Sequence, residues 1–200
     1  MVKRPVSTRE ALLQSALSLI WTQSYGGVSV DNICQAADAK KGSFYHYFES
    51  KAALTCAALE YLWEQFRPAL DRHFSAQNPP LERFKLYLDS NYREQAAMRK
   101  SHGHVVGCPF TSVASEQCAY ADGVQDKAVE ILARIERYIA NALRDAIDEG
   151  SLPSVDVDQM ARRFLTYELG ALSLARVKSD LEPLEGIFEI WMRMAGGRSE

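Results

Sequence analysis

Helical periodicity runs through almost the whole chain, and it is the feature that most limits the possible folds. No sustained alternation of apolar and polar residues, the pattern of a half-buried strand, is present. Apolar residues recur at steps of three and four most clearly in one long segment: Val124, Ala128, Ile131, Ile135, Ile139, Ala142 and Ala146. The sequence therefore predicts an all-α protein.

The predicted helices fall into two size classes. Three compact helices are expected over residues 8–25, 30–37 and 40–47, and about six further, mostly longer ones over 51–74, 80–98, a short stretch after Pro109, 124–147, 157–177 and 183–194. Ser7, Ser29, Ser50 and Asp156 are the predicted N-caps. We expect an N-terminal three-helix domain over residues 1–50 and a larger helical domain over residues 51–200.

Charge is distributed unevenly along a chain whose net charge is -3. Residues 1–51 carry six Lys or Arg and four Asp or Glu, a net of +2, which leaves -5 for the remainder. This balance argues against a protein that coats nucleic acid indiscriminately and favours a basic binding domain on an acidic body. No apolar run is long enough to cross a membrane, and the N-terminus lacks the apolar stretch of a secretory signal, so we expect a cytoplasmic protein.

The second and third compact helices, joined by a tight turn, have the outline of a helix-turn-helix. Residues 40–47 read Lys-Lys-Gly-Ser-Phe-Tyr-His-Tyr and contain no acid. With Phe44 and Phe48 facing inward, the side chains that remain available to DNA are those of Lys41, Ser43, Tyr45 and Tyr47. Lys51 starts the following helix, where it could reach a phosphate. The alternatives are that the aromatic residues are core and that the lysines form a solvated surface pair.

Residues 29–54 resemble the DNA-binding segment of the TetR family of bacterial repressors. The resemblance rests on the paired alanines 36–37 and on Gly42, Tyr45, Phe48, Lys51 and Leu54, and it covers residues 8–60 or so. Asp38 stands where the family usually has a turn glycine, and Lys40 where it usually has Ser or Thr. The resemblance implies that Lys41, Gly42, Ser43 and Tyr45 lie nearest base edges and that Ser29, Tyr47 and Lys51 contact phosphates, with Lys40 as a further cation at the DNA.

One reading helix spans too little DNA for strong specificity, so such modules usually bind as dimers to palindromic operators. The predicted helix 157–177 is apolar nearly all round and needs cover on both sides. By the resemblance, the last two helices of two chains form a homodimer interface, with these candidate residues: Phe164, Leu165, Glu168, Leu172 and Ala175. The alternative is a central core helix in a monomer.

The middle of the chain is rich in large amphipathic side chains, which could line a mostly apolar pocket. Such a stripe is also typical of plain core, and it is the family resemblance that implies a small-molecule inducer. The candidates are Trp63, Phe66, Tyr87, Asn91, Cys108, Phe110, Tyr120 and Tyr167.

Cys108 supports a second reading of the sensor. Pro109 favours the first position of a helix, which would place Cys108 at its N-cap, where a thiolate is stabilised. Gly107-Cys108 also resembles the electrophile-sensing, NemR-like subgroup of the family, although Pro109-Phe110 departs from its continuation. An inert buried cysteine is the alternative.

No catalytic or metal-binding constellation is present in the sequence. His102, His104 and Cys108 lack a structural-zinc spacing, and there is no G-x-S-x-G, P-loop or H-E-x-x-H motif. We therefore expect no enzyme, cofactor or metal. The sequence predicts a repressor released from its operator by a small-molecule inducer, or alternatively a regulator in which an electrophile or oxidant modifies Cys108.

Overall fold

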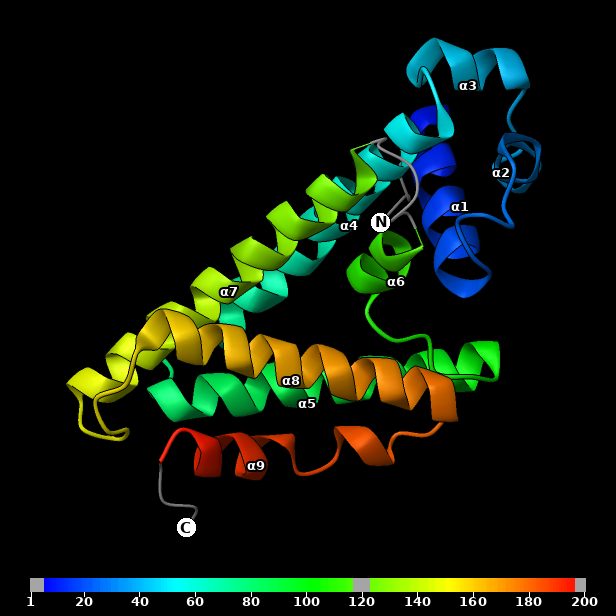
Figure 1. Cartoon of the computed structure of the whole chain (residues 1–200). Helices are drawn as coiled ribbons and strands as arrows, with labels where there is room; N and C mark the ends of the chain where they lie inside the picture. The colour runs from blue at the N-terminus through cyan, green and yellow to red at the C-terminus, as the bar shows by residue number, and fades with distance from the viewer. Residues whose placement is uncertain (1–5, 117–122, 197–200) are drawn as a thin grey trace, which may run out of the picture. The chain divides into compact units, whose positions relative to one another are not determined.

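The regular elements of the described residues are all helical. The computed structural model describes residues 6–116 and 123–196, and over these residues the predicted all-α fold is confirmed (Figure 1). The elements are α1 (Thr8–Thr22), α2 (Val30–Ala36), α3 (Lys41–Tyr47), α4 (Lys51–His73), α5 (Pro80–His102), α6 (Pro109–Ser115), α7 (Val124–Asp148), α8 (Val157–Lys178), the 3₁₀ turn η1 (Glu182–Leu184) and α9 (Ile187–Met194).

Side-chain caps define where four of the helices begin, as the sequence predicts. Each cap oxygen accepts a backbone N–H that has no partner within the helix. Ser7 accepts from Glu10 at 3.2 Å, Ser50 from Ala53 at 3.0 Å, and Asp156 from Gln159 at 2.9 Å. Ser29 and Asn32 form a reciprocal capping box at the start of α2.

The last predicted helix is interrupted. Pro183 lies in η1, and Gly186 then adopts a left-handed backbone with φ of 66°, so that α9 begins only at Ile187. A residue in that conformation cannot continue a right-handed helix, and glycine is the residue that adopts it most readily. The prediction of one continuous helix from residue 183 was therefore wrong. α5, in contrast, extends about one turn beyond its predicted end, to His102.

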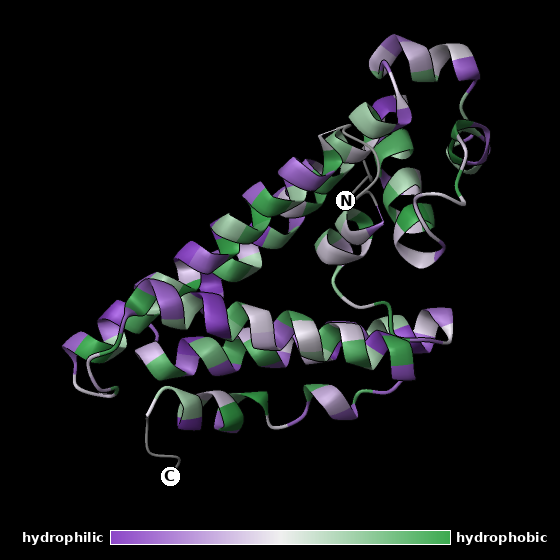
Figure 2. Ribbon diagram, viewed as in Figure 1, coloured by the Kyte–Doolittle hydropathy of each residue, from purple (hydrophilic) through white to green (hydrophobic). Residues whose placement is uncertain are grey.

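α7 has the apolar side that its sequence predicts. Val124, Ala128, Ile131 and Ile139 are buried, and hydrophobic and hydrophilic residues alternate along its ribbon (Figure 2). Among the described residues no helix is long and apolar enough to cross a membrane.

The described chain forms two compact units. The first contains residues up to 65 together with 109–131, and the second contains residues 66–108 and those from 132 onward. In the first unit α1 packs on α2, α3 and α6, around fully buried residues such as Leu12, Ile33, Phe44 and Leu54. The predicted domain boundary between residues 50 and 51 does not coincide with the limits of these packing units, and it stays a prediction.

The second unit has an aromatic core. The Phe84 ring centroid lies 5.3 Å from that of Phe164 and 4.5 Å from that of Trp191, and α5, α8 and α9 run side by side (Figure 1). Arg83 is buried beside this core, where it donates to the carboxylate of Asp145 and to the carbonyl of Asn78. A buried guanidinium needs such partners, because an unpaired buried charge is strongly unfavourable.

Candidate functional site

α3 presents its two tyrosines and most of its polar residues outward. Phe44 and Phe48 are buried as predicted, whereas the side chains of Tyr45 and Tyr47 are 56% and 43% exposed. Lys41 and Gly42 are exposed beside them. The Tyr45 ring centroid lies 5.0 Å from that of Phe44 and the Tyr47 ring centroid 6.4 Å from that of Phe48. The outer sides of both tyrosine rings remain in solvent and are available to a partner.

The turn that precedes α3 departs from what its sequence position favours. Asp38 has φ of 48°, in the left-handed region that glycine adopts without strain. Lys40 occupies the N-cap of α3 and makes no side-chain capping bond. The two residues that depart from the usual family sequence thus differ in their effect: Asp38 has a strained backbone, and Lys40 leaves the start of α3 without a side-chain cap. The Lys40 side chain is exposed to solvent.

Lys41, the predicted base contact, is paired within the chain. Its ammonium lies 2.8 Å from a carboxylate oxygen of Asp31 on α2, and both side chains are largely exposed. The hydrogen bond to Asp31 raises the pKa of Lys41. An exposed pair of this kind is weak, so a stronger anion could displace the carboxylate.

Ser29 and Lys51, the predicted phosphate contacts, are already engaged. The Ser29 hydroxyl accepts from the Asn32 backbone and lies 2.7 Å from the Asn32 side-chain oxygen. Lys51 turns inward, and its ammonium donates to the backbone carbonyls of Tyr25 at 2.7 Å and Val28 at 3.0 Å. A phosphate contact would require Lys51 to leave both carbonyls.

A polar cluster lies inside the second unit. Asn91 on α5 donates to Glu168 on α8 at 2.5 Å, and the Tyr87 hydroxyl donates to the same carboxylate. Glu168 is 1% exposed, and its second oxygen, Oε2, has no hydrogen-bond partner. Burial raises the pKa of Glu168 to about 7, against the smaller opposing effect of the two hydrogen bonds. A buried carboxylate without a cation is costly, and such groups are common at functional sites.

The loop before α6 is held against this interior. Gln95, one helical turn beyond Asn91, bonds both the N–H and the carbonyl of Gly107. Gly107 has φ of 71°, which strains a residue with a side chain, and an added Cβ would lie in a tight contact, 3.3 Å from the carbonyl oxygen of Leu172. Cys108 and Tyr167 pack against the buried cluster that includes Val105 and Leu172. Tyr87, Asn91 and Gln95 recur every four positions, and this spacing was the sequence signal for the polar cluster; the prediction included Tyr87 and Asn91 but not Gln95.

The other predicted ligand residues are dispersed. Trp63 and Phe110 are buried in the first unit, whereas Phe66 is half-buried in the second. Tyr120 lies outside the described residues. The structure brings Tyr87 and Asn91 together around Glu168 and places Cys108 and Tyr167 on an adjoining cluster, and the ligand pocket itself stays a prediction.

The five residues predicted for the dimer interface are core residues of their own chain. Exposed fractions range from 0% to 7% for Phe164, Leu165, Glu168, Leu172 and Ala175. Phe164 packs on Phe84 and Trp191, and Glu168 bonds Asn91. These side chains have almost no surface to offer a partner. The apolar residues that α8 does expose are Leu174, at 46%, and Val177, at 83%.

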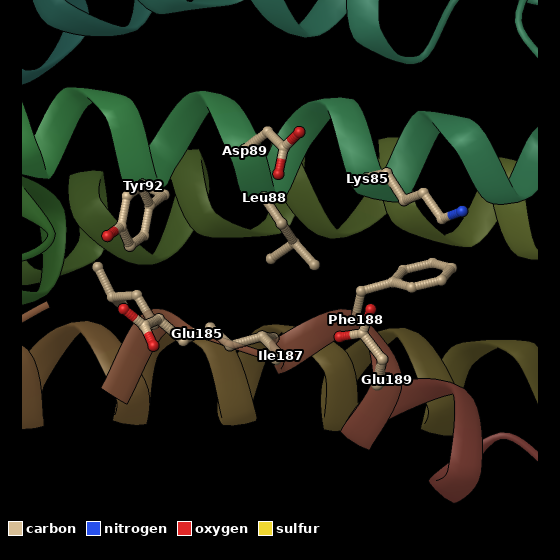
Figure 3. A pocket seen from close by; sticks show the side chains of 10 residues that line it. Lys85, Leu88, Asp89, Tyr92, Glu185, Ile187, Phe188 and Glu189 are labelled. Carbon is tan, nitrogen blue, oxygen red and sulfur yellow. The ribbon is translucent and has the colours of Figure 1, made fainter. Parts of the chain in front are cut away.

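An open groove of about 520 Å³ lies between α5 and the η1–α9 segment (Figure 3). Lys85 and Asp89 line one side and Glu185, Phe188 and Glu189 the other, with the Lys85 ammonium 5.0 Å from the Phe188 ring centroid. None of the predicted ligand residues lines this groove. Among the described residues, no group of three or more His, Cys, Asp and Glu side chains could hold a metal ion.

Two family models and several known proteins match this chain. Residues 12–58 match the model "Bacterial regulatory proteins, tetR family", and residues 81–191 match "Tetracyclin repressor-like, C-terminal domain". The chain is 30% identical to transcriptional regulator AcuR of Cereibacter sphaeroides over 88% of this chain and 79% of that one. It is 26% identical to the HTH-type transcriptional repressor NemR of Escherichia coli K12, over 89% and 88%. The crystal structure of a regulatory protein TetR from Rhodobacter sphaeroides matches with a TM-score of 0.82 and 29% identity, over 93% of this chain and 97% of that one.

Proposed function

The chain belongs to the TetR family and is a DNA-binding transcriptional regulator rather than an enzyme, and from that premise we propose that it is a homodimeric repressor that a small molecule releases from a palindromic operator. The observation that carries the proposal is α3, a helix without acids whose Lys41, Gly42 and Tyr45 are exposed while Phe44 anchors it in the core. Selection of bound sequences from random DNA with the purified protein tests it. A palindrome with two half-sites is expected, and the absence of any enriched sequence would contradict it.

At the operator, Lys41, Gly42, Ser43 and Tyr45 contact base edges, and Ser29, Lys40 and Tyr47 contact phosphates. Lysine can donate to guanine acceptors, and the small Gly42 lets the helix approach the groove closely. Lys41 exchanges Asp31 for the DNA when the complex forms. This exchange costs little, because the Lys41–Asp31 pair is exposed.

The second copy of the chain covers the outward face of α8, assisted by α9. That face carries the small residues Thr166, Gly170 and Ser173 together with the exposed Leu174 and Val177. Small side chains let two helices approach closely, and the exposed apolar side chains favour burial against another chain. The predicted interface thus stays on α8 but uses residues on its other side.

The inducer binds in the second unit and satisfies Glu168. Its Oε2 accepts a hydrogen bond from a donor group, above all a cationic nitrogen, since a charged partner offsets the cost of a buried carboxylate best. Operator release by amine, alcohol and carboxylate derivatives of one carbon skeleton tests this. The amine series should contain the inducers, and Glu168→Gln should bind the operator normally but lose release by them. Release by the carboxylates alone would contradict the assignment.

A second candidate sensor is Cys108, whose thiol an electrophile or oxidant would modify. Its half-buried position in the loop pinned by Gln95, immediately before α6, favours it over the buried Cys34. Mass-spectrometric labelling of each thiol with N-ethylmaleimide, together with operator release, tests this candidate. Faster labelling at Cys108 and loss of release in Cys108→Ser would support it. Release that persists in the serine variant would exclude it.

A further inference from the structure

The first residue of α4 is fastened to the turn between α1 and α2. The Lys51 ammonium donates to the carbonyls of Tyr25 and Val28 and lies 4.0 Å from the centroid of the Tyr25 ring. Tyr25 is 8% exposed and Val28 is 1% exposed. Burial lowers the pKa of Lys51, while the charge of Glu116 acts in the opposite direction. The Lys51 ammonium therefore binds groups within its own chain, whereas Lys40 and Lys41 are exposed to solvent.

The same turn is held from a second side by the residue that follows α6. The backbone N–H of Tyr25 donates to the Glu116 carboxylate at 2.7 Å. Side chains from two other parts of the chain thus bind both the N–H and the carbonyl of one residue. Gly26 and Gly27 come next, and glycine restricts the backbone least, so the position of this turn depends strongly on such outside contacts.

We propose that Lys51 and Glu116 are positioning residues that fix the α1–α2 turn, and with it the orientation of α2 and α3, and that Lys51 does not contact phosphate. The inference rests on the proposed function, in which α3 reads the operator. It adds a route of regulation, because Glu116 directly follows α6 and α6 begins at the residue after Cys108. A change that withdraws Glu116 would loosen the Tyr25 backbone without touching the DNA.

The sign of the effect at Glu116 separates positioning from simple electrostatics. Removing an acid normally strengthens DNA binding, because it reduces repulsion of the phosphates. The proposal predicts the reverse: Glu116→Ala should weaken operator binding about tenfold, as expected when a hydrogen bond to a charged group is lost. Glu116→Gln should largely retain binding, since its amide oxygen can still accept from Tyr25. Asp126→Ala, which removes an exposed acid from the same unit, is the matched control and should not weaken binding.

The salt dependence of operator binding tests Lys51. A phosphate contact contributes about 0.9 to the slope of log affinity against log salt concentration, whereas a positioning residue contributes nothing. Lys51→Met should lose about tenfold or more in affinity with an unchanged slope, and Lys40→Met, the exposed matched control, should reduce the slope by about one. Circular dichroism is used to check that each variant is folded. If Lys51→Met does not fold, the Glu116 variants still test the proposal.

Two results would overturn the inference: a slope reduced by about one in Lys51→Met, or binding by Glu116→Ala as tight as that of the wild type. If the proposed function itself were wrong, the wild-type protein would bind no operator in preference to random DNA. This result is distinct from the two results above, which concern the variants.

Discussion

Asp38 is the residue where the backbone of the helix-turn-helix is most strained. Its φ of 48° would cost a non-glycine residue roughly 1 kcal/mol, and Asp is among the residues that tolerate this best. We expect Asp38→Gly to raise the free energy of unfolding by up to about 1 kcal/mol in urea titrations. Ala39→Gly is the control, since Ala39 lacks a positive φ, and it should show no gain. Equal effects of the two substitutions would contradict the assignment of strain to Asp38.

Asp31 competes with DNA for Lys41. Asp31→Asn should strengthen operator binding by a few-fold at most, because an exposed ion pair is worth less than about 1 kcal/mol. Fluorescence anisotropy with a labelled operator measures this change. The gain should disappear in a Lys41→Ala background. A gain of the same size in both backgrounds would mean that Asp31 acts on the phosphates and not through Lys41.

Local sequence rules predicted much at the residue scale, since caps and apolar spacing depend on neighbours three or four positions away. Ser29, Phe44 and Phe48 are in the expected places for this reason. The direction of the Lys51 side chain could not be predicted, because its acceptors, the carbonyls of Tyr25 and Val28, lie 26 and 23 positions earlier in the chain. A long flexible side chain takes its position from tertiary neighbours, which a single sequence does not show.

At the scale of elements, Glu168 connects α8 to α5 and makes stability depend on pH. Its pKa is raised from 4.5 to about 7, so the folded state binds a proton more tightly than the unfolded state does. The contribution is full below about pH 4.5 and declines as pH rises toward 7, by an amount on the order of 3 kcal/mol. Urea titrations from pH 5 to 8 should show that Glu168→Gln lacks this decline. Parallel pH profiles for the two proteins would contradict it.

The neighbours that cover each side of α8 could not be predicted from the sequence. An apolar pattern nearly all round predicts burial, but it does not say which neighbour covers which side. The five residues predicted for the dimer interface instead form core contacts, such as those of Phe164 with Phe84 and Trp191. Glu168 was predicted to face a partner chain, whereas it faces Asn91.

In the proposed function, the whole molecule is a dimer of two chains. Val177→Arg should convert the dimer to a folded monomer, because it places an unpaired charge in the proposed interface, where burial costs about 3 kcal/mol or more, or roughly 100-fold in dissociation constant. Val177 is 83% exposed in the single chain, so the fold itself should tolerate the change. Val129→Arg on α7, at 58% exposure, is the control and should stay dimeric. Sedimentation velocity measures both, and a dimeric Val177→Arg would place the interface elsewhere.

We propose above that the exposed face of α3 reads a specific DNA sequence. The most direct measurement compares Tyr45→Ala with the wild type by anisotropy, on the selected operator and on scrambled DNA of the same length. Tyr45 is 56% exposed, so the substitution should leave the fold intact. We expect a loss on the order of 1–3 kcal/mol on the operator and almost none on scrambled DNA. Equal losses on both, or no loss on either, would contradict the assignment of α3 as the reading helix.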